Sequence, residues 1–431
     1  MTHRRLFRGA VLTAVALSLA LASYVPSARA ASSASPKVTI TVWNAYTHGL
    51  GDAFNHLVTK FQTLYPNITV QSIVSPNYTA LFQKEESAVL AGNPPTVGQA
   101  YESYVRQFNG QHAIQNLAPY INGKSGLSKK QINDFFAKDW KDGLLGKQRL
   151  MMPFSKSDIV LYFNRALLKK NGISSPPKTW YQFSKDCKKL TKRSGGRVTQ
   201  WCTTIQMDES NWFTWEREWG GQVLSHGKAA FDNRKGMAPV EFFRNLVKKG
   251  EVVVSNNFNY QDQADFDAGK TGFDISTSAG RTYEVSGAKP GVEVAETTFP
   301  AGPAHRATEI YGAPMTMFKK ASAAEKSAGW LFLKWLTEPR QTAYWAENTG
   351  YMPVRKSALK LSSMKKYYKQ FPQDRASVQQ LKYAISEPTY SGWSKAQTDL
   401  ETDLIAALSG TKSVPDAMKS AAAQVNSDLG H

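Results

Sequence analysis

Near its beginning the chain alternates between strand and helix patterns, and this alternation restricts the fold more than any other feature of the sequence. Lys37–Asn44 alternates apolar and polar residues as a half-buried strand does, and residues 49–64 repeat apolar side chains at helical spacing. Ile68–Val74 and Thr96–Tyr101 are two further predicted strands, separated by a helical pattern over Asn77–Leu90. This order of elements predicts a parallel α/β sheet.

Polar and aromatic residues stand at the ends of these predicted strands. They are Trp43–Thr47, Asn77-Tyr78 and Tyr101-Glu102. In parallel α/β sheets, ligands bind beyond the carboxyl ends of the strands. We therefore expect these residues to lie near a ligand.

The central stretch Leu150–Trp180 contains two apolar runs that are joined by the small polar segment Ser155–Asp158. Such a pattern suits a chain that crosses between two lobes, but an ordinary strand, loop and helix within one domain gives the same pattern. On these residues alone the second interpretation is favoured. Pro176-Pro177 ends any helix before it, and Thr179 can cap a helix that begins near Trp180.

The length of the chain favours two lobes. Its 431 residues, 42% of them hydrophobic, exceed one typical domain and can fill large cores. The sequence contains no internal repeat and no low-complexity linker. Two lobes without a linker favour several chain crossings, so that each lobe is discontinuous in sequence.

The first thirty residues have the pattern of an export signal. Three arginines precede the apolar run Ala10–Ala22, and Ala28-Arg29-Ala30 predicts cleavage after Ala30. A Sec signal is the default interpretation, although Arg4-Arg5-Leu6-Phe7 weakly resembles a twin-arginine signal. No cysteine follows the apolar run, so no lipid anchor is predicted, and no later apolar run is long enough to span a membrane. We expect a periplasmic or extracellular protein without membrane insertion.

The chain is strongly basic, with a formal net charge of +19 that falls to +15 when the predicted signal is removed. A nucleic-acid binder can have such a charge. However, export argues against that partner, and the densest basic cluster, Lys185–Arg197, has no interleaved aromatic residues for base stacking. We expect a solvated helix face that could attract anionic solutes or cell-wall polymers, and no nucleic acid.

The two cysteines, Cys187 and Cys202, flank the turn signal Ser194-Gly195-Gly196. A disulfide between them would suit an exported protein and contribute about 3 kcal/mol. Two buried free thiols are the alternative, and the disulfide is favoured.

Catalytic and metal-binding motifs are scarce. There is no Gly-x-Ser-x-Gly elbow, and the seven histidines show no HExxH spacing. Gly269-Lys270-Thr271 ends like a phosphate loop but lacks its first glycine. Asp262, Asp265 and Asp267 do not have EF-hand spacing, and a solvated helix end is the favoured interpretation. We expect no cofactor, no metal and no enzyme activity. A secreted glycan-active enzyme and a basic cell-wall-binding module remain alternatives.

Several motifs together resemble a known family, the extracellular solute-binding proteins (family 1) of ABC importers. The motifs are TVWNAYTHG, FQTLYPNITV, AGNPPTVGQAYE, PFSKSDIVLYFN, PPKTW, DFDAGKTGFDIST, ENTGYMPV and LSGTKSVPDAM. The resemblance implies a two-lobed α/β periplasmic-binding-protein fold of type II, with discontinuous lobes joined by a hinge. It also implies a monomer that closes on a small polar solute and delivers it to the ABC permease subunits.

The resemblance also predicts where the lobes begin and end. The first lobe would comprise residues 37–152 and 300–346, and the second lobe residues 153–299 and 347–431. The chain would cross between them near Pro153–Asp158, Phe299–Gly302 and Glu347–Tyr351.

Aligned by motif with members that bind glycerol 3-phosphate, the chain has the same residue type at six ligand-binding positions. These are Tyr78, Glu102, Ser157, Ser278, Gly312 and Tyr351. Glu102 would accept hydrogen bonds from hydroxyls, and Trp212, from the pair Trp212 and Trp215, would stack on the ligand. Taken singly, these residues also have explanations that involve no ligand. The tryptophans would fill the core, Glu102 would cap a helix, and Tyr351 would pack the turn.

One ligand position departs from the pattern. Gln397 stands where the resemblance implies an arginine that pairs with the phosphate. Without that cation, a phosphate monoester in a closed cleft would leave charge poorly compensated. The amide of Gln397 suits a glycerophosphodiester or an uncharged sugar better. We expect a glycerol phosphate or glycerophosphodiester type of ligand, with a mono- or oligosaccharide as the alternative.

Overall fold

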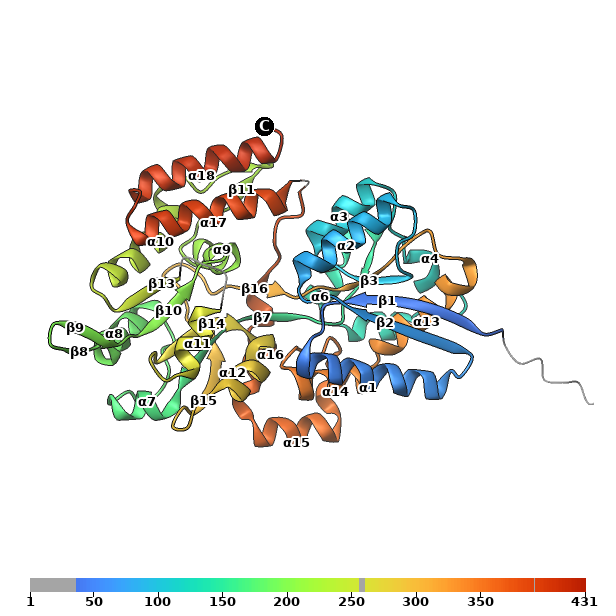
Figure 1. Ribbon diagram of the computed structural model, residues 1–431, viewed down its shortest axis with the longest axis horizontal. Coiled ribbons are helices and arrows are strands. Elements are labelled where there is room, and N and C mark those ends of the chain that lie inside the picture. Colours follow the sequence, from blue (N-terminus) through green and yellow to red (C-terminus); the bar gives the residue numbers. More distant parts are fainter. Residues whose placement is uncertain (1–35, 256–259, 391) are drawn as a thin grey trace, which may run out of the picture. The chain divides into compact units, whose positions relative to one another are not determined.

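A computed structural model describes residues 36–255, 260–390 and 392–431, so the predicted export signal lies outside the described residues (Figure 1). Residues Lys37–His431 form one unit by their contacts. Within this unit, two sheets each have a hydrophobic core of their own.

The first sheet combines three separate parts of the sequence. β1 (Val38–Asn44) pairs in parallel with β2 (Ile68–Val74) and β3 (Val97–Gln99), which confirms the predicted parallel arrangement. β17 (Met315–Met317) pairs antiparallel with β3 and with β6 (Met151–Met152). The sheet order is therefore β2-β1-β3-β17-β6.

The helices that belong with the first sheet bury apolar stripes. In α1, the apolar residues Phe54, Leu57 and Phe61 are buried as the helical spacing predicts, and Phe61 contacts Phe332 of α13. These elements are α1 (His48–Leu64), α2 (Tyr78–Leu90), α3 (Glu102–Gly110), α4 (Ala118–Ile121), α5 (Lys129–Asp134), α6 (Ala137–Asp142), the hairpin β4 (Leu144–Leu145) and β5 (Gln148–Arg149), α13 (Ala323–Leu336), α14 (Pro339–Thr349), η2 (Lys356–Lys360) and α15 (Ser362–Gln370).

The second sheet is built around β7 (Ser157–Asn164), whose eight residues are all buried. β14 (Phe273–Thr277) pairs antiparallel along one edge of β7. β15 (Val294–Thr298) and β16 (Thr308–Tyr311) also pair antiparallel with β7. β18 (Ala384–Ile385) pairs in parallel with β16. Because all eight residues are buried, both faces of β7 are covered, and the strand therefore lacks the alternation of a half-exposed strand.

The remaining elements of the second part are helices and short strand pairs. Thr179 caps α8 by accepting a hydrogen bond from Gln182, as predicted. The elements are α7 (Arg165–Lys170), α8 (Trp180–Leu190), β8 (Lys192–Ser194) with β9 (Arg197–Gln200), β10 (Thr203–Gln206) with β13 (Val252–Ser255), α9 (Glu209–Glu218), β11 (Leu224–Ser225) with β12 (Lys228–Ala229), α10 (Arg234–Lys248), α11 (Gln261–Asp267), η1 (Ser278–Gly280), α12 (Arg281–Gly287), η3 (Pro372–Arg375), α16 (Ala376–Gln380), η4 (Leu381–Tyr383), α17 (Trp393–Ser409) and α18 (Val414–Asp428).

The sequence pattern over residues 310–318 predicts one strand, but the structure divides it between the two sheets. β16 ends at Tyr311 in the second sheet, and β17 begins at Met315 in the first. Gly312 has φ +100°, and a Cβ atom there would lie 2.1 Å from the carbonyl oxygen of Ser155. The chain therefore turns and crosses at this glycine, later than the expected crossing at Phe299–Gly302.

The third crossing also differs from the expected position at Glu347–Tyr351. Tyr351 and Val354 lie in the core of the first sheet, and Tyr368 of α15 packs with residues of α14. α16, by contrast, packs on β7 and β15. We infer that the first lobe extends through α15 and that the second lobe resumes at η3.

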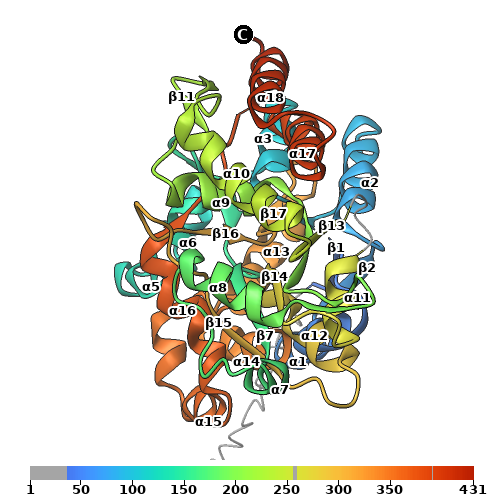
Figure 2. The ribbon, with the colours of Figure 1, turned by 90° about the vertical axis from the view of Figure 1, so that its left-hand side faces the viewer.

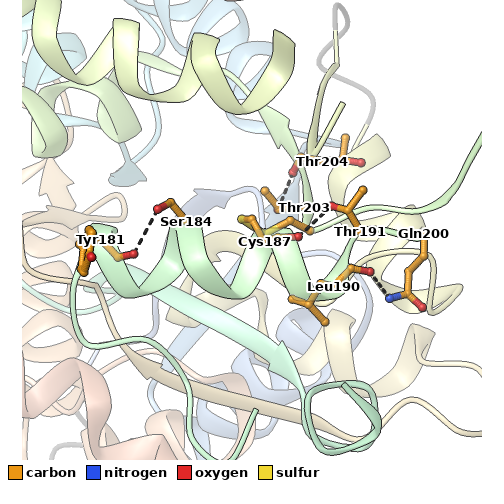
Figure 3. Close-up of a disulfide and its surroundings, with 9 residues drawn as sticks. Tyr181, Ser184, Cys187, Leu190, Thr191, Gln200, Thr203 and Thr204 are labelled. Atoms are coloured by element: carbon orange, nitrogen blue, oxygen red, sulfur yellow. Dashed lines mark hydrogen bonds between the residues drawn. A yellow bond between two sulfur atoms is a disulfide. The ribbon is translucent and has the colours of Figure 1, made fainter. Parts of the chain in front are cut away.

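A disulfide links Cys187 of α8 to Cys202, which confirms the predicted bridge (Figure 3). Both residues are buried in the core of the second sheet. Close by, Thr191 donates a hydrogen bond to the carbonyl of Cys187 at 2.8 Å. The bridge therefore closes the segment that contains the β8–β9 hairpin onto α8.

Replacing both cysteines by alanine should lower the free energy of unfolding by about 3 kcal/mol, because the bridge closes a loop with a sequence separation of 15 residues. Urea unfolding of the oxidised protein and of the double variant measures this loss. Wild-type protein unfolded in excess reductant is the matched control and should resemble the variant. Equal stability of the oxidised protein and the variant would contradict a bridge that constrains the unfolded chain.

Candidate functional site

Two tyrosines predicted to bind ligand meet in the structure. The hydroxyl oxygens of Tyr78, at the start of α2, and of Tyr351, just after α14, lie 3.2 Å apart. Gln99 donates a hydrogen bond from its side-chain amide to the hydroxyl of Tyr78 at 3.3 Å. Burial raises the pKa of Tyr78 to about 12 and that of Tyr351 well above its usual value. Both hydroxyls therefore stay protonated at neutral pH and can donate as well as accept hydrogen bonds.

Two further tyrosines extend this pair into an aromatic surface. The ring centroid of Tyr101 lies 4.9 Å from that of Tyr78 and 5.7 Å from that of Tyr311. Tyr311 belongs to β16 in the second sheet, whereas Tyr78 and Tyr101 follow strands of the first. The predicted site therefore lies where the segments of the two sheets meet.

Lys156, directly before β7, holds the polar centre of the site. Its ammonium nitrogen donates to Glu102 Oε1 at 2.9 Å, to Asp142 Oδ2 at 2.5 Å and to the carbonyl oxygen of Gly312 at 3.3 Å. A lysine ammonium has three N–H donors, so these three acceptors use all of them. Two of the acceptors, Glu102 and Gly312, are predicted ligand positions.

The charges of this cluster are nearly balanced within it. Burial alone would lower the pKa of Lys156, whose side chain is 1% exposed, but Asp142 and Glu102 raise it above its usual value. Burial would raise the pKa of Asp142, but Lys156 lowers it, so Asp142 stays ionised. Burial raises the pKa of Glu102, and Lys156 offsets only part of this effect. The cluster therefore has no positive charge to spare.

Two of the predicted ligand residues are serines with buried hydroxyls, and they lie next to the lysine cluster and the tyrosine pair. Ser157 pairs with Tyr311 across β7 and β16, and Ser278 begins η1. A Cβ atom at Gly350 would lie 2.3 Å from the carbonyl oxygen of Ser278, which places Ser278 against the turn that carries Tyr351. Within the described residues, the Oγ atoms of Ser157 and Ser278 have no hydrogen-bond partner. Buried hydroxyls in this state can bind a polar ligand.

Gln397 of α17 joins the site through Glu387. Its side-chain amide donates to Glu387 Oε2 at 3.2 Å. Glu387 is close enough to Glu102 that its charge contributes to the raised pKa of Glu102. Gln397 therefore lies on an acidic side of the site.

Trp212 does not share the surroundings of the other predicted residues. Its ring has 0% exposure and packs edge-on against Phe231 in the core of the second sheet. Trp215 stacks on Phe243 in the same core, with ring centroids 3.9 Å apart. Seven of the eight predicted residues therefore lie near one another or share neighbouring residues. Trp212 is the exception, and its packing favours the explanation that it belongs to the core.

Sequence reasoning missed several residues of the site. The sequence pattern places Lys156 only in a small polar segment, and no motif marks Asp142, Tyr311 or Glu387. A lone lysine between two apolar, strand-like runs was the one available signal for Lys156, because such a side chain must find acceptors when its neighbours are buried. The other three come from distant segments, and no local pattern marks them.

The structure corrects the prediction that the aspartates of α11 form a solvated helix end. Asp262 and Asp265 are buried, and Asp265 accepts hydrogen bonds from Thr204 at 2.8 Å and from Lys270 at 3.0 Å.

Across the described ranges, no group of three or more His, Cys, Asp or Glu residues is arranged to hold a metal ion. In the same residues, no helix has the length and apolar character needed to cross a membrane.

Comparison with known proteins identifies the class. The fold, with its two sheets and a site between their segments, is that of the periplasmic solute-binding proteins. The sequence profile of the bacterial extracellular solute-binding proteins matches residues 56–373, and the chain belongs to this family. It is a solute-binding protein of an ABC importer and not an enzyme.

Proteins similar to this chain are named for two kinds of ligand. The chain is 23% identical over 419 residues to the sn-glycerol-3-phosphate-binding periplasmic protein UgpB of Pectobacterium atrosepticum, covering 90% of this chain and 91% of that protein. The crystal structure of UgpB from Mycobacterium tuberculosis in complex with glycerophosphocholine has a TM-score of 0.79 at 18% identity, covering 91% and 98%. The cyclic alpha-maltosyl-1,6-maltose binding protein of Arthrobacter globiformis has a TM-score of 0.77 at 21% identity, covering 91% and 99%.

Replacing Lys156 by methionine should lower the free energy of unfolding by about 3–5 kcal/mol, because Glu102 and Asp142 would lose their buried counter-ion. Urea unfolding measures the loss. Lys395 is a matched control: it also contacts two carboxylates, Asp399 and Asp428, but its side chain is 64% exposed. Lys395→Met should leave the free energy of unfolding close to that of wild type, because solvent screens an exposed ion pair. A similar loss for both variants would contradict a buried, structurally required cation at Lys156.

Asp158 should make stability depend on pH. Burial raises the pKa of Asp158 to about 7, against about 3.9 for an unfolded aspartate. Between these values the folded state binds the extra proton, so this group reduces stability as pH rises from about 4 to 7. Asp158→Asn should therefore raise the melting temperature more at pH 8 than at pH 5. Asp232→Asn, at an exposed position, is the control. Parallel pH profiles for wild type and Asp158→Asn would exclude the effect.

Proposed function

We propose that the site around Glu102 and Tyr351 captures a small polyol with little or no negative charge, a glycerophosphodiester type of ligand, and that the protein delivers it to a membrane permease. The observation that carries this proposal is the state of Lys156. All three of its donors are bound to protein oxygens. The cation at the site is therefore committed to the protein and not to a ligand phosphate.

The charges around the site disfavour a phosphate monoester. Glu102 and Asp142 both contact Lys156, and Glu387 lies near Glu102. Gln397, which contacts Glu387, replaces the arginine that the family resemblance implies. A monoester carries about 1.5 to 2 negative charges at neutral pH. Enclosing it here would add a poorly paired buried charge beside carboxylates. A phosphodiester carries one charge, and a sugar carries none.

The remaining groups suit hydroxyls and carbon faces. Ser157 and Ser278 offer hydroxyl hydrogen bonds, and Tyr78 and Tyr351 offer hydroxyls at the edge of their rings. Aromatic rings with polar tips are common where proteins bind polyols and sugars. The same chemistry supports our second candidate, a mono- or oligosaccharide, which the surface formed by Tyr78, Tyr101 and Tyr311 favours.

The crossing segments support closure by a hinge. Met352, in the turn after α14, donates a backbone hydrogen bond to the carbonyl of Lys156 in the first crossing at 2.7 Å. Gly312, in the second crossing, also accepts a hydrogen bond from Lys156, so the two crossings lie side by side. We expect rotation about these adjacent segments to open and close the site.

Calorimetry with glycerol 3-phosphate, glycerophosphocholine and maltose tests the ligand class. We expect the diester or the sugar to bind at least about tenfold more tightly than glycerol 3-phosphate, because the monoester lacks a counter-ion. Gln397→Arg combined with Glu387→Gln should shift preference toward the monoester. The second change removes the carboxylate that would otherwise pair with the new arginine.

Gln397→Met is the matched control for that experiment. It removes the amide without adding charge, so it should weaken binding without favouring the monoester. If wild type binds glycerol 3-phosphate more tightly than the diester and the sugar, the charge argument fails.

A further inference from the structure

The second lobe carries a dense basic face that the binding site does not use. Residues 165–200 contain ten lysines and arginines and a single acid, Asp186. All six cations of the predicted cluster over Lys185–Arg197 are exposed, as expected for a solvated surface. The surface is not one helix face, however, because it continues from α8 onto the β8–β9 hairpin.

Hydrogen bonds from side chains to backbone carbonyls bring further cations onto the same face. Lys189 donates from its ammonium to the carbonyl of Gly172 at 3.5 Å, which brings α8 next to the end of α7 with its exposed Lys169 and Lys170. Arg193 donates to the carbonyl of Lys249, which brings the hairpin next to the end of α10. Figure 2 views the molecule from the side that carries α7, α8 and α10. Four elements thus contribute cations to one surface.

Few negative charges oppose this basic face. Asp186 is half-buried near Lys189, and Glu251 is half-buried near Lys188 and Arg193. Burial raises the pKa of both carboxyls. The face therefore keeps a large positive excess, which attracts a polyanionic partner over distances of about 10 Å at 0.1 M salt.

The basic face is also held rigid. The Cys187–Cys202 disulfide closes α8 onto the segment that contains the hairpin. Lys192 donates to the carbonyl of Lys189 at 2.9 Å, which fixes the start of the hairpin against the end of the helix. A preorganised array of charges loses less entropy on binding than a flexible tail would.

An exposed tyrosine adds a second chemical feature. Tyr181, at the start of α8, is 67% exposed, and the ammonium of Lys185 lies 4.4 Å from its ring centroid. Tyrosine rings are enriched at the headgroup level of bilayers, and lysines are attracted to anionic headgroups. A single ring does not provide the series of stacking platforms that a single-stranded nucleic acid requires.

We propose that this basic face binds anionic phospholipid headgroups and holds the exported protein at the outer surface of its membrane. Lysines near an anionic bilayer each add to the binding, and several act together. Because the protein delivers its solute at the membrane, such binding would raise its concentration next to the permease. This proposal does not depend on which solute the site binds.

Co-sedimentation with vesicles tests the proposal, using residues 31–431. We expect binding to vesicles of phosphatidylcholine with 30% phosphatidylglycerol at about 50 mM salt, and release at about 500 mM salt because the attraction is screened. Vesicles of phosphatidylcholine alone should not bind. Replacing Lys185, Lys188, Lys189 and Lys192 by glutamate should lower the partition coefficient at least about 100-fold.

A control with the same net charge separates the face from the bulk charge. Lys129, Lys130, Lys365 and Lys366 are exposed on α5 and α15 of the first lobe. Their replacement by glutamate should leave binding within about threefold of wild type. Equal losses for the two variants, or no preference for the anionic vesicles, would overturn the proposal.

Two further measurements cover misfolding and the rival partner. The same four lysines of the basic face replaced by glutamine should also weaken vesicle binding, with thermal unfolding near that of wild type. A soluble poly(glycerol phosphate) is added as competitor in the vesicle assay. If it binds more tightly than the vesicles do, the partner is a cell-wall polymer and the assignment to lipid is wrong.

Discussion

The buried ammonium of Lys156 is the interaction on which the rest of the site depends. A lysine with 1% side-chain exposure must have acceptors for its three donors, because an unpaired buried charge costs several kcal/mol. Those acceptors come from α3, from α6 and from the crossing at Gly312. One charge therefore fixes the ends of two helices and one crossing segment relative to the start of β7. Tyr101, Ser157 and Tyr311 are the chain neighbours of Glu102, Lys156 and Gly312, so the same arrangement also positions them.

The elements that could be predicted from sequence are those set by local chemistry. The parallel pairing of β1 with β2 and β3 follows from the alternation of patterns, and the Thr179 cap follows from one side chain. The disulfide followed from two cysteines around a turn in an exported chain. Each of these depends on residues close in sequence or on a rule of topology.

The errors share a different cause, which is contact between distant segments. Residues 310–318 have an unbroken strand pattern, and the division between β16 and β17 depends on how closely Gly312 approaches Ser155. Asp265 has the sequence pattern of a solvated residue because its partner Thr204 lies about sixty residues earlier in the chain. Tryptophan is a residue type that often stacks on ligands, but the ring of Trp212 packs on Phe231 in the core. Periodicity records which residues are buried, but not what buries them.

The distribution of charge connects these observations with function. Exposed cations gather on α8 and the β8–β9 hairpin, whereas carboxyls such as Asp274, Glu284 and Glu296 are buried with pKa values raised by burial. A basic chain can thus have an interior and a binding site that are acidic or neutral. The net charge of +19 consequently says little about the charge of the ligand. In our proposal, the local ratio of carboxylates to free donors around Lys156 sets the ligand charge, and that ratio suits hydroxyls better than a phosphate dianion.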